Sequence, residues 1–296
     1  MKSSTRVRFI IFVLIISLVT GLTSCSKPKE KNSESHSRTD KTYKVQIEAR
    51  YDNNGTILQT YKRTYDEAGN LIEYISSSPD KPTRREEFSY DDSGHCIKEV
   101  IYRDNKLSST SEIIYNSYGD RVEVISYDAE GKRESKGTKF EYQYDKNGNM
   151  IYRCRYYGEE IDEELEYAYD ADGNLIKETW LTTPGLGTVE YEYDRSGKIK
   201  SRKHTYSGGA ITHAEWEYDA AGNNIKFTEF DGFTGNRTSE YKYDANGNMI
   251  DELTLSDSGD YNHHQYEYDD MGNIIKSTNL HKDGTIGGWT EYEYVY

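Results

Sequence analysis

The chain has 296 residues, of which 34% are hydrophobic and 30% charged, and its formal net charge is −15. This acidic balance argues against nucleic acid and anionic lipid headgroups as partners, because both would repel the chain. The 29 tyrosines outnumber the 7 phenylalanines. We therefore expect a core of phenol rings rather than aliphatic side chains, with hydrogen-bond partners for the buried hydroxyls.

Residues 1–24 have the form of an export signal: basic residues, a short apolar run at 9–16, and small residues after it. The run is shorter than the roughly 20 residues that span a bilayer, which favours removal over retention. The sequence Leu22-Thr23-Ser24-Cys25 resembles the lipobox of bacterial lipoproteins. That resemblance implies cleavage before Cys25 and acylation of its thiol, so that acyl chains anchor the chain to a membrane. A plain secretory signal is the alternative.

Residues 25–41 form the next segment, the lipidated linker. It has almost no apolar side chain, so it cannot bury a core and should be a flexible tether. Ser26 follows the cysteine where an aspartate would favour inner-membrane retention in bacteria that use that sorting rule. We expect a lipid-anchored protein of the bacterial cell envelope, at the outer membrane or cell surface rather than the inner membrane.

A repeated unit fills residues 42–296. Its Tyr-Asp-x-x-Gly-Asn core begins at Tyr65 and recurs in steps of 25, 25, 29, 25, 24, 25, 25 and 25 residues, which marks a repeat protein. In the copy at 240–250, tyrosines alternate with charged residues, the period of a strand. Asp244 and Gly247 favour a tight turn, so each unit is predicted to be a β-hairpin. The repeat-defining residues are Tyr65, Gly69, Tyr90, Gly94, Tyr144, Gly148, Tyr169, Gly173, Tyr218, Gly222, Tyr243, Gly247, Tyr268 and Gly272.

A second set of turns lies at the half period, for example at 102–105 and 127–131, so each period holds two strands of an antiparallel meander. Helical periodicity is missing, which makes 42–296 one repeat domain. The step of 29 fits four extra residues at 130–137. Residues 290–296 are expected to be a closing strand or cap, with no effector domain after them.

The predicted fold class is all-β, an antiparallel repeat array of β-hairpins. A flat sheet of roughly twenty strands at about 4.8 Å would be nearly 100 Å wide, which strand twist does not permit. We therefore expect an open, coiled sheet or incomplete β-spiral shell with the tyrosine face inside. Its unpaired edges would invite self-association. The glutamates before the inner aromatic positions should face solvent: Glu87, Glu112, Glu141, Glu166, Glu190, Glu215, Glu240 and Glu291.

The unit Tyr-Asp-x-x-Gly-Asn-x-Ile at this spacing resembles the YD repeat of the Rhs/YD-repeat family, found in bacterial Rhs and wall-associated proteins, Tc-type toxin shells and teneurins. The resemblance covers about 250 residues. In large members of the family the repeats spiral into a hollow β-shell, often around a toxic C-terminal segment released by self-cleavage. This chain shows no such cleavage motif, and we expect a short shell-type element without a toxin segment.

The sequence predicts no catalytic residue, metal or cofactor. The stretch from Asp170 to Gly173 resembles the start of a calcium loop but lacks the later ligands. His263 and His264 should point to opposite faces of a strand as surface residues, and the recurring glutamates fit a solvated face better than an acid–base pair. Cys96 and Cys154 lie about two repeats apart, roughly 19 Å, so we expect no disulfide between them.

Trp180, Trp216 and Trp289 are the candidate ligand-binding residues, because indoles stack on sugar rings; packing within the wall is the alternative. We expect a non-enzymatic cell-envelope lipoprotein whose repeat domain binds a glycan or an envelope protein. The other candidate is a shortened Rhs-type element that wraps or neutralises a toxin-like partner. An enzyme is a third reading, which turnover abolished by one carboxylate substitution would support.

Overall fold

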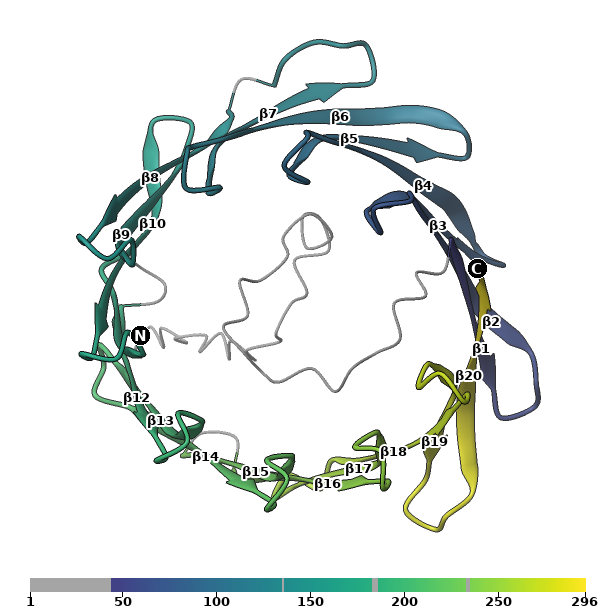
Figure 1. The fold of residues 1–296 in the computed structure, drawn as a ribbon. Coiled ribbons are helices and arrows are strands. Elements are labelled where there is room, and N and C mark those ends of the chain that lie inside the picture. Colours follow the sequence, from purple (N-terminus) through teal and green to yellow (C-terminus); the bar gives the residue numbers. More distant parts are fainter. Residues whose placement is uncertain (1–43, 135, 183–185, 233–234) are drawn as a thin grey trace, which may run out of the picture. The chain divides into compact units, whose positions relative to one another are not determined.

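The computed structural model describes residues 44–134, 136–182, 186–232 and 235–296. In these residues twenty strands follow one another along the chain and form one antiparallel sheet (Figure 1). The first ten are β1 (Val45–Asp52), β2 (Ile57–Tyr65), β3 (Leu71–Ser78), β4 (Lys81–Tyr90), β5 (Cys96–Arg103), β6 (Lys106–Tyr115), β7 (Arg121–Asp128), β8 (Thr138–Tyr144), β9 (Met150–Tyr157) and β10 (Glu160–Tyr169). The others are β11 (Leu175–Trp180), β12 (Gly187–Tyr193), β13 (Ile199–Tyr206), β14 (Ile211–Tyr218), β15 (Asn224–Asp231), β16 (Arg237–Tyr243), β17 (Met249–Ser256), β18 (Tyr261–Tyr268), β19 (Ile274–Leu280) and β20 (Ile286–Val295).

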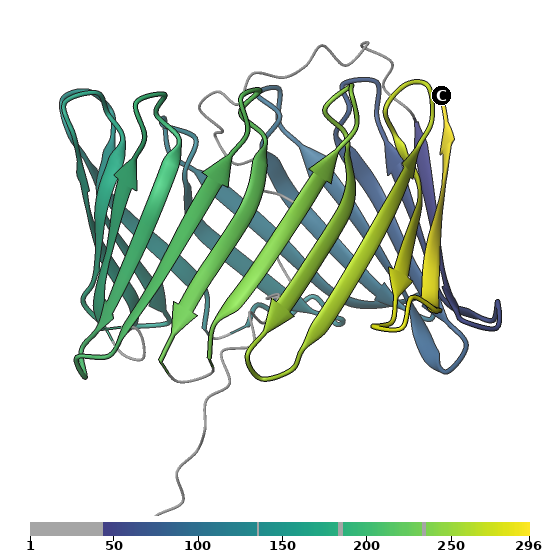
Figure 2. The same ribbon diagram turned by 90° about the horizontal axis from the view of Figure 1, so that it is seen from below.

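The sheet closes on itself. β1 pairs with β2 and also with β20, from Val45 opposite Val295 to Asp52 opposite Gly288. The strands form a closed ring seen along its axis in Figure 1, and they tilt between two rims of turns in Figure 2. The expected open sheet or incomplete spiral is therefore wrong. The closing strand expected at 290–296 belongs largely to β20, and its pairing with β1 satisfies both edges of the sheet.

The Tyr-Asp-x-x-Gly-Asn turns confirm the predicted turn chemistry. In the turn after β16, the Asp244 N–H donates to the carbonyl of Asn248 at 2.9 Å, and the Gly247 N–H donates to the carbonyl of Asp244 at 3.1 Å. The carboxylate of Asp244 accepts from the N–H groups of Asn246 and Asn248 and from Asn248 Nδ2. Gly247 has φ +81°, which glycine adopts without strain. The side chain of Asn248 thus fixes the orientation of the Asp244 carboxylate, a role that was not assigned from the sequence.

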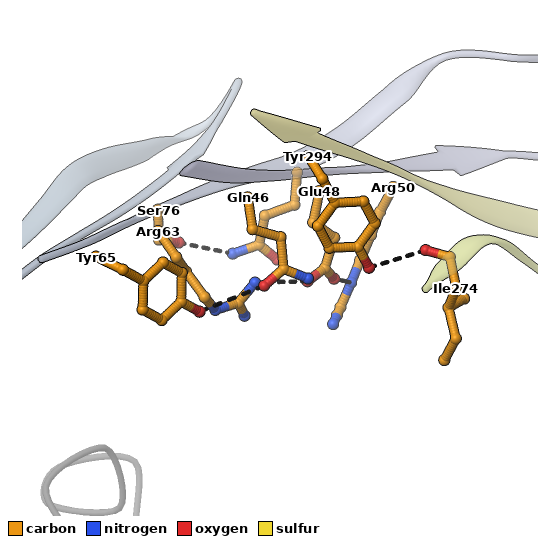
Figure 3. Close-up of polar contacts among 9 residues, drawn as sticks. Gln46, Glu48, Arg50, Arg63, Tyr65, Ser76, Ile274 and Tyr294 are labelled. Carbon is orange, nitrogen blue, oxygen red and sulfur yellow. Dashed lines mark hydrogen bonds and ion pairs between the residues drawn. The ribbon is translucent and has the colours of Figure 1, made fainter. Parts of the chain in front are cut away.

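The two faces of the sheet are distinct. Residues directly opposite each other on neighbouring strands share a face, so Arg63, Gln46 and Tyr294 lie on the same face. Figure 3 shows these side chains on the concave side of the sheet, which we call the inner wall. The expected solvent-facing glutamates lie on the other face, and all are exposed except the half-buried Glu87.

Some of those outer glutamates also accept hydrogen bonds. The hydroxyl of Tyr102 donates to Glu87 at 3.3 Å, and that of Tyr127 donates to Glu112 at 3.1 Å. The same contact joins Tyr156 to Glu141 at 3.1 Å. The outer face is therefore hydrogen-bonded from strand to strand as well as solvated.

On the inner wall, the turn tyrosine of each repeat is bonded to the repeat before it. The Tyr218 hydroxyl donates to the carbonyl of Ile199 at 2.8 Å. Ile199 lies opposite Tyr193, where the ladder shifts register. Such a shift leaves backbone groups outside the ladder, and the tyrosine pairs one of them. We call these bonds tyrosine clips; the others join Tyr90 to Leu71, Tyr115 to Cys96, Tyr169 to Met150, Tyr193 to Leu175, Tyr243 to Asn224, Tyr268 to Met249 and Tyr294 to Ile274.

In the longer repeat, a different tyrosine forms the clip. The extra residues of this repeat lie between β7 and β8, as predicted, and only two residue pairs join those strands. Here Tyr142 donates to the carbonyl of Arg121 at 2.7 Å, whereas Tyr144 donates to Asp120 Oδ2 at 2.6 Å. The insertion therefore moves the clip two residues along the strand.

Cys96 and Cys154 are buried and form no disulfide, as predicted. The described residues include no helix with the length and hydrophobicity needed to cross a lipid bilayer.

Removal of a clip hydroxyl should lower the stability of the sheet. We expect Tyr218→Phe to reduce the free energy of unfolding by about 1–2 kcal/mol, because the carbonyl of Ile199 loses its donor. The measurement is urea denaturation followed by circular dichroism. Tyr241→Phe is the matched control: this inner-wall tyrosine has no hydroxyl bond in the described residues, and its substitution should cost much less. Equal losses in the two variants would contradict the clip.

Candidate binding surface on the inner wall

Arginine and lysine are segregated between the two faces of the sheet. The arginines of the inner wall are Arg50, Arg63, Arg84, Arg103, Arg121, Arg153, Arg155, Arg202 and Arg237. The lysines of the strand centres face outward: Lys62, Lys98, Lys139, Lys177, Lys203, Lys226, Lys242 and Lys276. A guanidinium stacks on aromatic rings and bonds carboxylates with two N–H groups, whereas an ammonium is strongly hydrated. The inner wall is therefore suited to recognition, and the outer face to solvent.

Sequence reasoning missed this segregation, although strand alternation carries the signal. Arg63 lies two residues before Tyr65, so the two side chains share a face. A step of six residues, which also keeps the face, places Arg84 with Tyr90 and Arg237 with Tyr243.

A charged cluster on the inner wall joins β1 to β2 (Figure 3). Glu48 is only 5% exposed, and its two carboxylate oxygens lie 2.9 Å from Arg50 Nε and 3.1 Å from Arg63 Nη1. The guanidinium of Arg50 lies 4.8 Å from the ring centre of Tyr61, and that of Arg63 lies 5.5 Å from the ring centre of Tyr74. Both oxygens of the buried carboxylate are paired, so this cluster fastens the strands beside the closing seam.

Glu99 on β5 is a second buried carboxyl. It is 3% exposed and lies opposite Phe88 of β4 and Ser111 of β6. Burial, together with the nearby charge of Glu86, raises the pKa of Glu99 to about 7, although the cation of Arg84 acts in the other direction. Arg84 forms an ion pair with Glu86 rather than with Glu99. Glu99 therefore retains a proton at a pH where other carboxyls have lost theirs.

The three candidate tryptophans do not form one site. Trp180 and Trp216 lie on the inner wall, on β11 and β14, and the rings of Trp216 and Phe227 are 5.0 Å apart. Trp289 lies on the outer face at the closing seam. Its ring stacks on Tyr51 at 5.1 Å, and its Nε1 donates to Glu291 at 3.1 Å. Trp289 thus packs the seam, which leaves two tryptophans on the inner wall.

The residue opposite Trp180 must be a glycine. Trp180 lies opposite Gly187, where a Cβ atom would come within 2.5 Å of the Thr205 carbonyl oxygen. The backbone of β12 and β13 therefore excludes a larger residue beside the indole. The indole Nε1 is buried and has no hydrogen-bond partner among the described residues.

The aspartates that resembled a calcium loop are engaged in turns. Asp170 accepts from the N–H groups of Asp172 and Asn174, and from Asn174 Nδ2 at 2.9 Å. The hydrogen bond from the Asn174 side chain is the main cause that lowers the pKa of Asp170. In the part of the chain that the structure describes, no group of three or more His, Cys, Asp or Glu side chains is placed to hold a metal ion.

The adjacent histidines lie on opposite faces of β18, as predicted. His263 was expected to be a surface residue, but its side chain is partly buried. Its Nε2 lies 2.9 Å from Asp251 Oδ2, and its Nδ1 lies 3.2 Å from the Tyr261 hydroxyl. This hydrogen-bonded row on the outer face was not predicted. Asp251 also lies 3.2 Å from Lys242 Nζ, so the row belongs to a wider ion-pair network.

Comparison with known proteins supports the repeat assignment. A family model described as Teneurin YD-shell matches residues 185–281. No curated protein matches the sequence. The solved TcdB2-TccC3-Cdc42 structure is similar over 80% of this chain at 16% identity and a TM-score of 0.40, and this chain covers 15% of that one. A porin-like protein from Bacteroides uniformis is similar over 86% of this chain and 98% of its own length, at 12% identity and a TM-score of 0.34.

The raised pKa of Glu99 predicts a pH-dependent stability. A carboxyl whose pKa rises on folding stabilises the fold fully below the unfolded value near 4.5, and this contribution is lost as the pH rises through about 7. Glu99→Gln should therefore match the wild type at pH 4.5 and exceed it at pH 8 by roughly 1–3 kcal/mol after solvent screening. Urea denaturation at both pH values measures this difference.

The control for that measurement is Glu240→Gln, which changes an exposed glutamate of the outer face. Its difference from the wild type should be the same at the two pH values. A Glu99→Gln variant that is less stable than the wild type at pH 8 would show that the ionised carboxylate is favourable in the wall.

Proposed function

We propose that the chain is a member of the Rhs/YD-repeat family, as the match of the Teneurin YD-shell model to residues 185–281 supports, and that it serves as a non-enzymatic, lipid-anchored binding ring of the bacterial cell envelope. The observation that supports this proposal best is the chemistry of the inner wall. Arginines and aromatic rings are gathered there beside glutamates such as Glu48, Glu163 and Glu229, while lysines and further glutamates cover the outside. Closed sheets with many strands enclose space that a ligand can enter. The ligand therefore binds inside the ring.

Two ligand classes fit such a wall, a glycan and a segment of an envelope protein. Aromatic faces stack on sugar rings and on apolar side chains, and guanidinium groups bond the carboxylates of either class. Arg202 illustrates the available chemistry: it forms an ion pair with Glu229 at 3.0 Å, yet its side chain remains 35% exposed. The exposed part of the guanidinium is open to a ligand.

A non-enzymatic role is supported by how the conspicuous acids of the described strands and turns are used. Asp170 and Asp244 hold turns, and Glu48 is bonded through both oxygens. A general acid or base must be within reach of a substrate proton, and these groups already have partners. Turnover that depends on a single carboxylate would overturn this part of the proposal.

The anchor is proposed from the sequence, because Cys25 lies outside the described residues. Acyl chains on this cysteine would hold the ring at the membrane, and residues 26–41 would separate the two. The absence of Asp after the cysteine favours the outer membrane or the cell surface.

A second candidate function is the wrapping or neutralising of a toxin-like partner. It is favoured by the match of the Teneurin YD-shell model to residues 185–281 and by the closure of the sheet around a space. In this case the partner would be a polypeptide held within the ring, and a toxin encoded beside this chain would support the idea.

Substitution of the anchor residue should release the protein. We expect Cys25→Ser to abolish incorporation of radiolabelled palmitate and to leave the signal uncut at residue 24, because acylation precedes the cut in bacterial lipoproteins. Membrane fractionation and mass spectrometry of the N-terminus measure both effects. Cys96→Ser is the control, since that thiol is buried in the repeat domain and should not affect anchoring. Palmitate that persists in Cys25→Ser would contradict the proposed anchor.

Ligand capture should depend on the inner wall and not on the outer face. Arg202 and Lys203 are consecutive residues that face inward and outward respectively. In a pull-down from envelope extract, with binding also tested on a glycan array, Arg202→Gln should reduce capture several-fold while Lys203→Gln leaves it unchanged. Equal capture by the two variants would place the binding surface elsewhere. A captured toxin rather than a glycan would favour the second candidate function.

A further inference from the structure

One arc of the inner wall holds a series of buried nitrogen atoms that have no acceptor among the described residues. These are Arg121 Nη1 on β7, Arg153 Nε and Arg155 Nε on β9, Trp180 Nε1 on β11 and His204 Nε2 on β13. We call these five residues the donor arc. Resting on the proposed function of the ring, we propose that the donor arc binds an acidic polysaccharide, with sugar carboxylates at its arginines and a sugar ring against Trp180.

The members of the donor arc share the inner face. Arg153 and Trp180 lie on either side of Leu165, which is directly opposite each of them. Arg121 lies opposite Tyr115, and His204 lies opposite Val189, a buried residue of the same wall. The strand register assigns Arg153, Trp180 and His204 to the inner face. At Arg121 the register shifts, and its guanidinium is assigned to that face because it lies 6.0 Å from the ring centre of Phe140, which is opposite Arg155.

The orphan atoms point to a ligand rich in acceptors. The nitrogen atoms of arginine and the indole N–H only donate hydrogen bonds. Buried donors in native proteins are nearly always paired with protein, water or a bound group. Burial and the charge of Arg202 lower the pKa of His204, so its ring is neutral and its Nε2 takes either role. Elsewhere in the described residues, Arg84 Nε lies against Glu86, and Arg85, whose Nε also lacks an acceptor, faces outward and pairs with Glu87.

The arginines of the arc are partly exposed, although acidic side chains lie beside them, among them Glu178 opposite Val189. Arg153 is paired with Glu163, and Arg155 lies 2.6 Å from Asp162 and 4.0 Å from Glu163, yet the side chains remain 32% and 39% exposed. Each guanidinium has five N–H donors in a planar fork, so some donors remain unused. Arg121 has no ion pair among the described residues, and its guanidinium lies 6.0 Å from the ring centre of Phe140. The unused donors match the planar carboxylate of a uronic acid.

The aromatic surroundings favour a sugar over an acidic peptide. Trp180 presents an indole beside the arginines, and Tyr142 lies opposite Arg153. Glutamate and aspartate supply carboxylates but no ring for stacking, whereas a uronic acid supplies both. The arc members lie on alternate strands, at steps of roughly 10 Å. A ligand that meets several of them runs across the strands, as a polymer does and a monosaccharide does not.

The test uses the full-length chain carrying Cys25→Ser, with polygalacturonate as the acidic probe and dextran as the neutral one. Isothermal titration should show binding to polygalacturonate that weakens as salt rises, and no binding to dextran. The double variant Arg153→Gln, Arg155→Gln should weaken binding at least tenfold. Trp180→Phe should weaken it several-fold, because phenylalanine loses the N–H and part of the stacking surface. The outer-face substitutions Arg85→Gln and Lys203→Gln should change it less than twofold.

Two further measurements keep the outcome clear. Arg153→Gln combined with Glu163→Gln removes both charges of the ion pair, so a loss of binding in a variant that unfolds at the wild-type temperature reflects the missing donor. Poly-glutamate is the polypeptide probe: binding as tight as that of polygalacturonate, and unchanged in Trp180→Phe, would overturn the polysaccharide assignment. Absence of binding to either polyanion would overturn the donor arc as a site. In that case the proposed ring function would still stand if Arg202→Gln, but not Lys203→Gln, lost its ligand from envelope extract.

Discussion

The hydroxyl of one tyrosine per repeat is the contact on which the rest of this structure depends. It donates to a backbone carbonyl of the preceding repeat, at the point where the register of the ladder shifts. The shift is forced by the turn, since the glycine at positive φ and the aspartate cap fix the geometry of the returning strand. A carbonyl left out of the ladder would be costly if it stayed unpaired. The tyrosine pairs it and thereby joins neighbouring hairpins in a fixed relation.

The same set of contacts explains how the sheet closes. At the seam, Tyr294 makes an ordinary clip to the carbonyl of Ile274 at 2.9 Å. Tyr65 has no complete repeat before it, and its hydroxyl instead lies 3.5 Å from Gln46 Oε1 (Figure 3). On the outer face, Glu291 hydrogen-bonds Tyr51 and so raises the pKa of that phenol, although burial contributes more. This pairing repeats the tyrosine–glutamate contacts within the sheet. β1 therefore pairs with β20 in the way that the first strand of a further repeat would, and this pairing closes the ring.

The sequence was sufficient for the strands and turns and insufficient for closure. The strands and turns depend on residues that are close together in the sequence. Strand alternation, the Asp and Gly of each turn and the period of about 25 residues together predict the twenty strands. Whether the first and last strands meet depends on the small rotation added by each hairpin, which accumulates around the ring and has no single residue as its signature. Glu48 shows the same limit: its partner Arg50 is two residues away, but the second partner, Arg63, is supplied by strand pairing. For the tryptophans, strand alternation is informative: Trp289 lies three residues before Tyr292 and so faces outward, whereas Trp216 lies two residues before Tyr218 and faces inward.

The division between the two faces links this architecture to binding. An exposed wall needs only solubility, and the outward lysines and glutamates supply it with charges that are easily hydrated. An inner wall that needed only to be filled would be served by apolar side chains, because a buried ion pair adds little stability over well-packed hydrophobic residues. Instead the wall keeps arginines beside phenol rings and leaves Arg155 39% exposed, and the Trp180 indole N–H has no acceptor in the part of the chain that the structure describes. These inner side chains lower the stability of the fold and can be reached from the enclosed space, so a ligand explains them better than packing does. The two faces differ in this respect, and for this reason the ligand is expected inside the ring.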